Sequence, residues 1–366
     1  MNRMFAIERG TCYVVFAYDV GLAIDLDEAE RRLSSATRGL IRHKRRAPQY
    51  FAYKPAPIRI AQGVEPVQMA GMSTEPQMEL VVYDFGAISV IYRISLNSES
   101  RLLSMSEGLY ENAQLLTDSL RRVEDLLRIV EPAVSKPSVS PVVEDYLIFH
   151  IETLAEPLPI EELTVRHAPH IAQVLRAEAS ELSMDEVRDA MSHQISFGKD
   201  DVAIVDWNAS LVVGHDSEDV LTVLEFANVQ LLEMRFLDQR LDEALALAYS
   251  RLSKRSKKRF ALYSDPSDLR DISQWQVDSA ILFEGVNNAL KLLGDQYLAR
   301  LSRLAAQRFH LSDWDTSILR KLQTLEGIYA KISDRLVSRR MEVLEWIIIV
   351  LIATEIILPF LTNGLH

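Results

Sequence analysis

A heptad pattern of apolar residues near the C-terminus is the most regular feature of the chain. From residue 318 onward, apolar or aromatic residues recur at alternating steps of four and three. The positions are Ile318, Leu322, Leu325, Tyr329, Ile332 and Leu336. With one polar break at Arg339, the rhythm continues through Val343 into the tail of the chain. Such spacing places these residues on one face of a helix, and that face requires a partner helix.

The tail from residue 346 to 361 is almost wholly apolar. As a helix it would be about 24 Å long, against roughly 30 Å for the hydrocarbon core of a bilayer. A glutamate inside it would cost roughly 2–3 kcal/mol near the bilayer centre. We therefore expect an anchor that enters a membrane as a bundle, or a helix buried in the core of an oligomer. The residues expected to make these contacts are Trp346, Ile347, Ile349, Val350, Glu355 and Phe360.

Three earlier segments are rich in β-branched and aromatic residues, at 11–24, 79–94 and 201–213. This composition predicts strands or hairpins. In the clearest case, Phe85 and Gly86 lie between two such arms, and the glycine can supply the positive φ of a tight turn.

Two of these turns have similar sequences. Tyr83–Ala87 and Val205–Ala209 share the order aspartate, aromatic residue, turn-forming residue, alanine, and each precedes a long predicted helix. Tyr18–Leu22 is a weaker third example. The similarity suggests repeated hairpin-plus-helix units, with independent convergence on the same turn chemistry as the alternative.

The order of these elements predicts the fold class. Apolar periodicity indicates helices over 106–130 and 217–250, between the strand segments. We therefore expect an α+β domain over residues 1–265, with helices and a mixed or antiparallel sheet. An antiparallel coiled-coil helical hairpin over 266–340 and a C-terminal apolar helix over 341–361 complete the prediction.

Composition narrows the class of protein. Of 366 residues, 48% are hydrophobic and 25% charged, which excludes wholesale disorder. A single cysteine, Cys12, excludes an internal disulfide and suits a reducing compartment. The net charge of -12 argues against a protein that coats nucleic acid generally.

Sequence motifs give no sign of a reaction. The chain has neither a phosphate-binding loop nor a Cys/His set at zinc spacing. We therefore expect no catalytic residues, no metal, no cofactor and no small-molecule substrate. An enzyme whose carboxylates are dispersed in the sequence and meet only in the fold remains an alternative.

A dense basic cluster follows the helix predicted at 217–250. It comprises Arg251, Lys254, Arg255, Lys257, Lys258 and Arg259. Positive charge suits the negative end of a helix dipole, so a solvated helix end is the simpler interpretation. Binding of RNA, a ribosome or anionic lipid headgroups is the functional one.

Two short blocks resemble a known family. Leu344-Glu345-Trp346 precedes an isoleucine-rich segment that contains Glu355, and this resembles the C-terminal signature of the required for meiotic nuclear division (RMND) family. The hairpin Val82–Val90 is similar to a strand segment of the same family. The resemblance implies a membrane-associated, self-assembling protein without established enzymatic activity. Its eukaryotic members are attached to the mitochondrial inner membrane and linked to mitochondrial translation.

The N-terminus has no arginine-rich amphipathic transit segment, so we expect a bacterial relative in the inner (cytoplasmic) membrane, with the bulk of the chain in the cytoplasm. The leading hypothesis is a self-assembling scaffold or tether, anchored by its C-terminus and linked to translation or membrane organisation. The alternatives are a soluble homo-oligomer with a buried tail, an RNA- or ribosome-binding module, and the enzyme described above.

Overall fold

The computed structural model describes residues 5–36, 55–69, 71–215, 217–257, 274, 277–281, 283–285 and 296–363. The chain divides into two compact units, which are described separately. The first comprises residues 1–238 and 281–316, and the second comprises 239–280 and 317–366. The predicted boundary at residue 265 lies outside the described residues.

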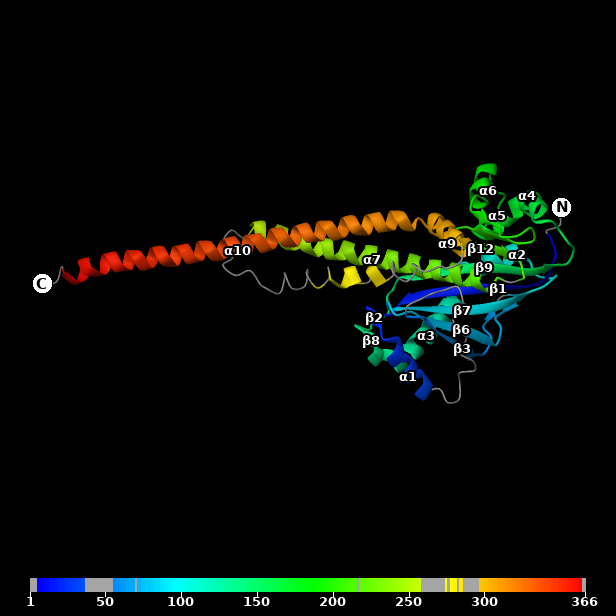
Figure 1. Ribbon diagram of the computed structural model, residues 1–366, viewed down its shortest axis with the longest axis horizontal. Coiled ribbons are helices and arrows are strands. Elements are labelled where there is room, and N and C mark those ends of the chain that lie inside the picture. Colours follow the sequence, from blue (N-terminus) through cyan, green and yellow to red (C-terminus); the bar gives the residue numbers. More distant parts are fainter. Residues whose placement is uncertain are drawn as a thin grey trace. The chain divides into compact units, whose positions relative to one another are not determined.

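The first unit contains the strands and most of the helices (Figure 1). The strands are β1 (Ile7–Asp19), β2 (Ala23–Ile24), β3 (Ile58–Gly63), β4 (Gln68–Met69), β5 (Met72–Ser73), β6 (Gln77–Val82), β7 (Ala87–Leu96), β8 (Val134–Ser135), β9 (Val143–Leu154), β10 (Gln194–Ile195), β11 (Val202–Val205) and β12 (Ala209–Val213). The labelled helices within the described residues are α1 (Leu26–Ala36), α2 (Leu102–Leu109), α3 (Ala113–Val130), α4 (Ile160–Arg166), α5 (Ala168–Arg176), α6 (Met184–Ala190), α7 (Glu218–Lys257), α9 (Gln296–Arg308) and α10 (Leu311–Asn363), with a 3-10 turn at Glu131–Ala133.

Eight strands form one mixed sheet in the order β10-β11-β12-β9-β1-β7-β6-β3. Neighbouring strands are antiparallel, except that β12 runs parallel to β9. The predicted α+β class with a mixed sheet is therefore confirmed. The segments at 79–94 and 201–213 form the hairpins β6–β7 and β11–β12, and the segment at 11–24 lies mainly in the central strand β1.

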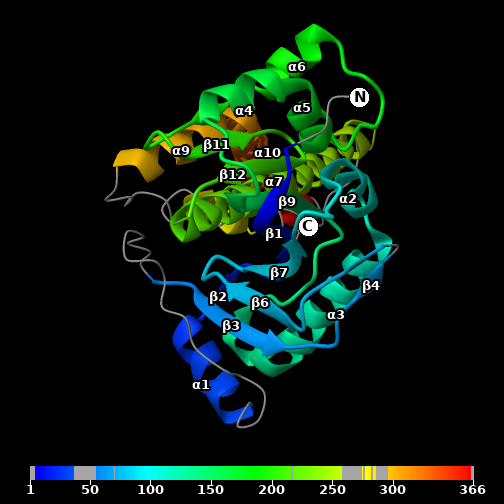
Figure 2. The same cartoon turned by 90° about the vertical axis from the view of Figure 1, so that its right-hand side faces the viewer.

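The two faces of the sheet differ in chemistry. On one face, alternate residues of β1 point toward α3, where the Tyr18 hydroxyl lies 2.6 Å from the Ser119 hydroxyl. Val14, Phe16 and Tyr18 belong to the main apolar core, and burying each such side chain stabilises the fold by roughly 1.5–3 kcal/mol. Figure 2 shows α3 and α5 on this side of the sheet and the start of α7 on the other.

The turn between β6 and β7 depends on a glycine. Gly86 has a φ of 97°, and a Cβ atom there would overlap the carbonyl oxygen of Gly21. The N–H of Val20 donates to the Gly86 carbonyl at 2.8 Å, so the turn packs against the end of β1. Asn208, the corresponding residue of the β11–β12 turn, has no positive φ. The two turns thus differ in backbone geometry, and a repeated unit stays a prediction.

In the second unit, the end of α7 packs against α10. Lys321 Nζ lies 2.6 Å from Asp242 Oδ1, and the two helices run in the same direction in Figure 1. The buried apolar residues of this unit are Leu241, Ala244 and Ala248 on α7, and Ile318, Leu325 and Ile328 on α10. The helical C-terminal region is confirmed, and the first half of the heptad seam has its partner helix within the same chain.

Candidate functional site

The longest run of exposed apolar side chains in the described residues lies on α10. Met341, Leu344 and the seven consecutive residues from Trp346 to Ile352 are each between 50% and 67% exposed. Because an α-helix turns once every 3.6 residues, seven consecutive residues pass almost twice around it. The apolar surface therefore covers the whole circumference of the helix and is not a single stripe.

The exposure follows from the lengths of the two paired helices. With Asp242 beside Lys321, the end of α7 at Lys257 lies opposite about residue 336 of α10, because parallel helices have the same rise per residue. Four of the six predicted anchor residues, Trp346, Ile347, Ile349 and Val350, lie beyond that point and are exposed.

Two of the predicted residue sets are described only in part. The side chains of Glu355 and Phe360 lie outside the described residues, as do those of the seam residues Ile332 and Leu336. Leu322 and Tyr329 of the seam are half-buried.

No helix among the described residues is both long enough and apolar enough to cross a bilayer. The structure therefore does not support the predicted transmembrane helix.

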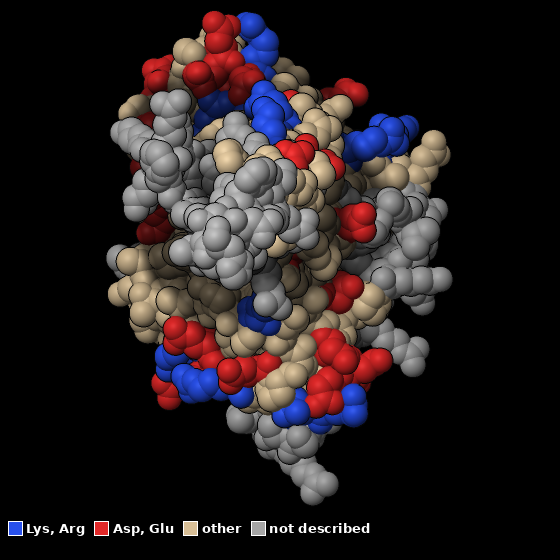
Figure 3. Space-filling model, turned by 90° about the vertical axis from the view of Figure 1, so that its left-hand side faces the viewer, with Lys and Arg blue, Asp and Glu red and all other residues tan. Residues whose placement is uncertain are grey.

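The basic cluster that follows residue 250 begins within a helix. α7 extends to Lys257, so Arg251, Lys254, Arg255 and Lys257 are helical. Their side chains, and all of Lys258 and Arg259, lie outside the described residues. On the face drawn in Figure 3, acidic and basic side chains of the described residues are intermingled and form no continuous field of one sign. Binding of an anionic partner by this cluster stays a prediction.

A second candidate site lies where α7 covers the sheet. All but one of the residues from Val220 to Met234 are buried, including the polar Glu225, Asn228 and Glu233. Glu225 accepts hydrogen bonds from Arg59 Nη2 at 2.9 Å and from the Tyr83 hydroxyl at 2.8 Å. Burial raises the pKa of Glu225, while Arg59 opposes that rise.

Further along α7, the buried carboxyl group of Glu233 lies near the carboxyl group of Asp19. Both carboxyl oxygens of Glu233 are buried and have no hydrogen-bond partner in the described residues. Burial raises the pKa of Glu233 well above its ordinary value, and the neighbouring Asp19 raises it further. Nearby, burial raises the pKa of Glu144 to about 7, although Arg235 forms an ion pair with it.

The fold thus gathers carboxyl groups that are far apart in the sequence. Perturbed carboxyl pKa values are frequent at functional sites, but buried structural networks produce them too. Across the described ranges, no three His, Cys, Asp or Glu side chains lie close enough together to hold a metal ion.

A pocket with a cavity volume of about 60 Å³ opens between the sheet and the first two turns of α7. Its charged lining residues are Arg59, Glu79, Arg93, Glu218 and Glu225. Its remaining lining residues are Tyr13, Val15, Ile91, Ile148, Leu221 and Thr222. Sequence analysis missed this pocket, because its walls come from β1, β3, β6, β7, β9 and α7.

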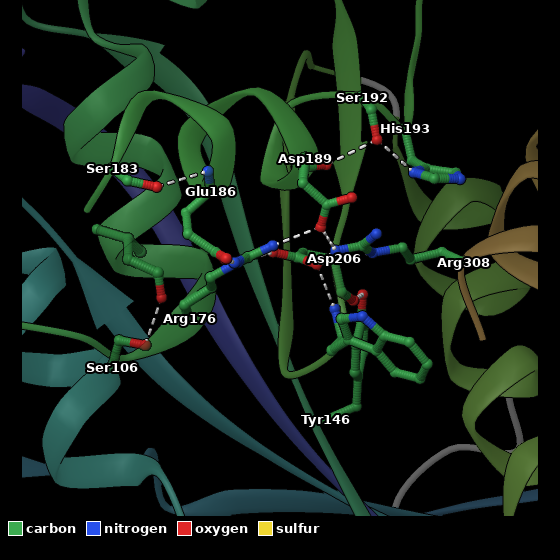
Figure 4. Close-up of polar contacts among 12 residues, drawn as sticks. Ser106, Tyr146, Arg176, Ser183, Glu186, Asp189, Ser192, His193, Asp206 and Arg308 are labelled. Carbon is green, nitrogen blue, oxygen red and sulfur yellow. Dashed lines mark hydrogen bonds and ion pairs between the residues drawn. The ribbon is translucent and has the colours of Figure 1, made fainter.

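A third polar cluster fixes the junction of α9 and α10 to the sheet (Figure 4). Asp206 is fully buried and accepts hydrogen bonds from Arg308 Nε at 2.7 Å and from Arg176 Nε at 3.1 Å. Both arginines also donate to Asp189, at 2.8 Å and 2.6 Å respectively. The hydrogen bond from Arg308 lowers the pKa of Asp189.

Aromatic contacts support the same junction. The Trp207 ring stacks on His310 with 5.2 Å between ring centroids, and the Arg308 guanidinium lies 5.5 Å from the Trp207 centroid. Phe309 is fully buried, with its ring edge-on to Tyr146 at 5.3 Å. Every charge in this cluster has a counter-charge, so we interpret the cluster as an anchor for the junction and not as a ligand site.

These observations define an α+β protein with a mixed eight-stranded sheet, a polar helix–sheet interface and a long C-terminal helix. The family described as "Uncharacterized protein MJ0711, N-terminal domain" matches residues 9–219, and this chain belongs to that family. One relative is the uncharacterized protein MJ0711 of Methanocaldococcus jannaschii. It is 22% identical over 236 residues, which cover 62% of this chain and 68% of the relative. No solved structure matches the chain.

Proposed function

We propose that this protein is a self-assembling scaffold that associates with a membrane through the apolar end of α10. The observation that carries the proposal is the exposure of apolar side chains around the whole helix from Trp346 to Ile352. A run of seven exposed apolar residues marks a site that contacts a partner or a lipid surface. A helix that is apolar all round is suited to burial on every side.

Exposure of apolar residues on all sides of the helix favours lipid over a single partner helix. A coiled-coil partner covers only one stripe, as α7 does for Ile318 and Leu325. Lipid chains, or several copies of the same helix within lipid, cover all sides. Glu345 is exposed and Glu355 lies further along the same helix, so association of several copies would keep these carboxylates away from lipid.

In this proposal the α+β unit is the part that is displayed, and α10 is the part that attaches. The resemblance of residues 339–356 to the RMND family supports the same function, including a link to translation or membrane organisation. The protein would then hold a partner at a membrane surface and would not carry out a reaction.

Flotation with phospholipid vesicles tests the attachment. We expect the full chain to float with the vesicles and a chain ending at Arg340 to remain at the bottom of the gradient. A matched control replaces Leu319, an apolar residue of the same helix that is 46% exposed, with serine, and this variant should float like the parent. The proposal is wrong if the full chain and the shortened chain both remain at the bottom.

The mass of the detergent-free protein separates lipid attachment from a buried tail. One outcome is a full chain that forms a defined oligomer and does not bind vesicles, together with a shortened chain that is a monomer. In that case the tail is buried between copies, and the membrane role is excluded.

A further inference from the structure

The pocket beneath the start of α7 contains the guanidinium group of Arg93, whose ion pair with Glu79 is long. Arg93 Nη2 lies 3.5 Å from Glu79 Oε2, at the outer limit of a hydrogen bond. On the other side of the same carboxylate, Arg59 Nη1 lies 3.4 Å from Glu79 Oε1. Two guanidinium groups therefore converge on one carboxylate, and neither makes a short contact with it.

The other charges at the pocket are less available to a ligand. Glu225 is engaged by Arg59 at 2.9 Å and by the Tyr83 hydroxyl at 2.8 Å. Glu218 is exposed to solvent, which screens its charge. Although the lining carries more carboxylates than guanidinium groups, the group with unused hydrogen-bonding capacity among the described contacts is Arg93. Its side chain is 21% exposed and lies over the Tyr13 ring.

Apart from Tyr13 and Thr222, the uncharged part of the wall is apolar. Val15, Ile91 and Ile148 come from the sheet and Leu221 comes from α7. An inorganic anion would leave this surface in contact with water, whereas a ligand with a short hydrocarbon part would cover it.

We propose that this pocket binds a small organic carboxylate, whose carboxylate group pairs with Arg93 and whose short hydrocarbon chain packs on the apolar wall. Arginine binds carboxylates through two parallel N–H donors, a stronger arrangement than its 3.5 Å contact with Glu79. Glu79 then acts as an internal competitor for the ligand. The proposal does not depend on the membrane role of α10.

This competition predicts opposite effects for two substitutions. Arg93→Gln removes the donor fork and should weaken binding at least about tenfold, since a hydrogen bond to a charged group contributes roughly 1.5–3 kcal/mol. Glu79→Gln removes the competing charge and should strengthen binding. A site for a cation would show the reverse pattern, because Glu79 would be its ligand.

Isothermal titration calorimetry of the full chain tests the proposal with three probes that share a four-carbon chain: butyrate, butyramide and butylamine. We expect butyrate to bind, Arg93→Gln to weaken its binding at least about tenfold and Glu79→Gln to increase the affinity. Arg9→Gln is the matched control, because Arg9 pairs with Glu152 at the surface and is 65% exposed; it should leave binding unchanged. Circular dichroism of each variant confirms that it is folded.

Three results would overturn the proposal. These are binding of butylamine in preference to butyrate, equal binding of butyrate and butyramide, and weaker binding of butyrate after Glu79→Gln. If Arg93→Gln does not fold, the Glu79→Gln variant and the three probes still decide between an anion site and a cation site.

Discussion

Single buried polar residues distinguish the two faces of the sheet. The face that contains Phe16 and Tyr18 packs in an ordinary apolar core, and its buried hydroxyls are hydrogen-bonded. The face beneath α7 instead buries Glu225 with two donors and Glu233 with none among the described residues. Burial without a hydrogen-bond donor disfavours the ionised form of a carboxyl group. Ionisation of Glu233 therefore destabilises the folded state.

Replacing Glu233 with glutamine should stabilise the protein at neutral pH. The pKa of Glu233 is raised in the folded state, so its ionisation opposes folding. The parent therefore loses stability as pH rises above the unfolded value near 4.5, by up to about 1.4 kcal/mol per pH unit until the folded pKa is passed. Urea denaturation at pH 4 and pH 7 measures this difference.

The glutamine variant should gain little at pH 4 and most at pH 7. Glu107→Gln, at an exposed position of α2, is the control and should change stability equally at both values. A Glu233→Gln variant that is less stable than the parent at pH 7 would show that the carboxylate is ionised and paired.

Residue-level inference from sequence succeeded where the cause was local. The need for a positive φ at Gly86 followed from its position between two β-rich arms, and the structure confirms it. Arg59 with Glu225, and Asp206 with Arg308, lie more than a hundred residues apart in the chain, so no local pattern reveals them. The available signal was the presence of Glu225, Asn228 and Glu233 in a largely apolar stretch of helix.

At the scale of secondary-structure elements, the β6–β7 hairpin and the helix α10 each contain a glycine, and the two glycines differ in backbone conformation and in the space available for a Cβ atom. Gly86 occupies a left-handed conformation with no space for a Cβ atom. Gly327 lies inside α10, and nothing lies within 4 Å of a Cβ atom built there. The same substitution should therefore act in opposite directions at these two positions.

Gly86→Ala should destabilise the protein by more than about 1 kcal/mol, because strain in φ adds to the overlap with Gly21. Gly327→Ala should stabilise α10 by about 0.5–1 kcal/mol through helix propensity. Thermal denaturation of both variants beside the parent measures the contrast. Equal melting temperatures for all three proteins would refute this account of the turn.

Helix boundaries were predicted less well than helix positions. The helix expected to end near residue 250 continues to Lys257. Lysine and arginine are good helix formers and interact favourably with the negative end of the dipole, so the basic run prolongs the helix that it was expected to follow. The heptad spacing from Ile318 identified a helix face correctly but did not specify that α7 would cover it.

At the scale of the whole molecule, the two units bury separate sets of apolar residues. Leu325 is fully buried in the second unit, whereas Leu319 on the same helix is 46% exposed. Leu325→Asp should therefore disrupt the packing of α7 on α10, because it buries a charge that has no partner.

We expect Leu325→Asp to lose helical circular dichroism in a separate, earlier transition while the sheet-containing unit unfolds near its normal temperature. Leu319→Asp is the control and should shift this transition much less. A single cooperative loss of all structure in the Leu325→Asp variant would show that the two units do not unfold independently.

The position of β1 in the sheet sets the order in which the chain acquires structure during synthesis. This strand precedes the other strands of the sheet in the chain, yet it lies near the centre, where Tyr13 pairs with Arg93 on one side and Ile148 on the other. Pairings between such distant residues form slowly, in about milliseconds to seconds for sheet-rich proteins. Until β9 has been made, the apolar residues of β1 lack one of their two neighbouring strands. The nascent chain therefore has to shield the apolar residues of β1 until β9 has been translated.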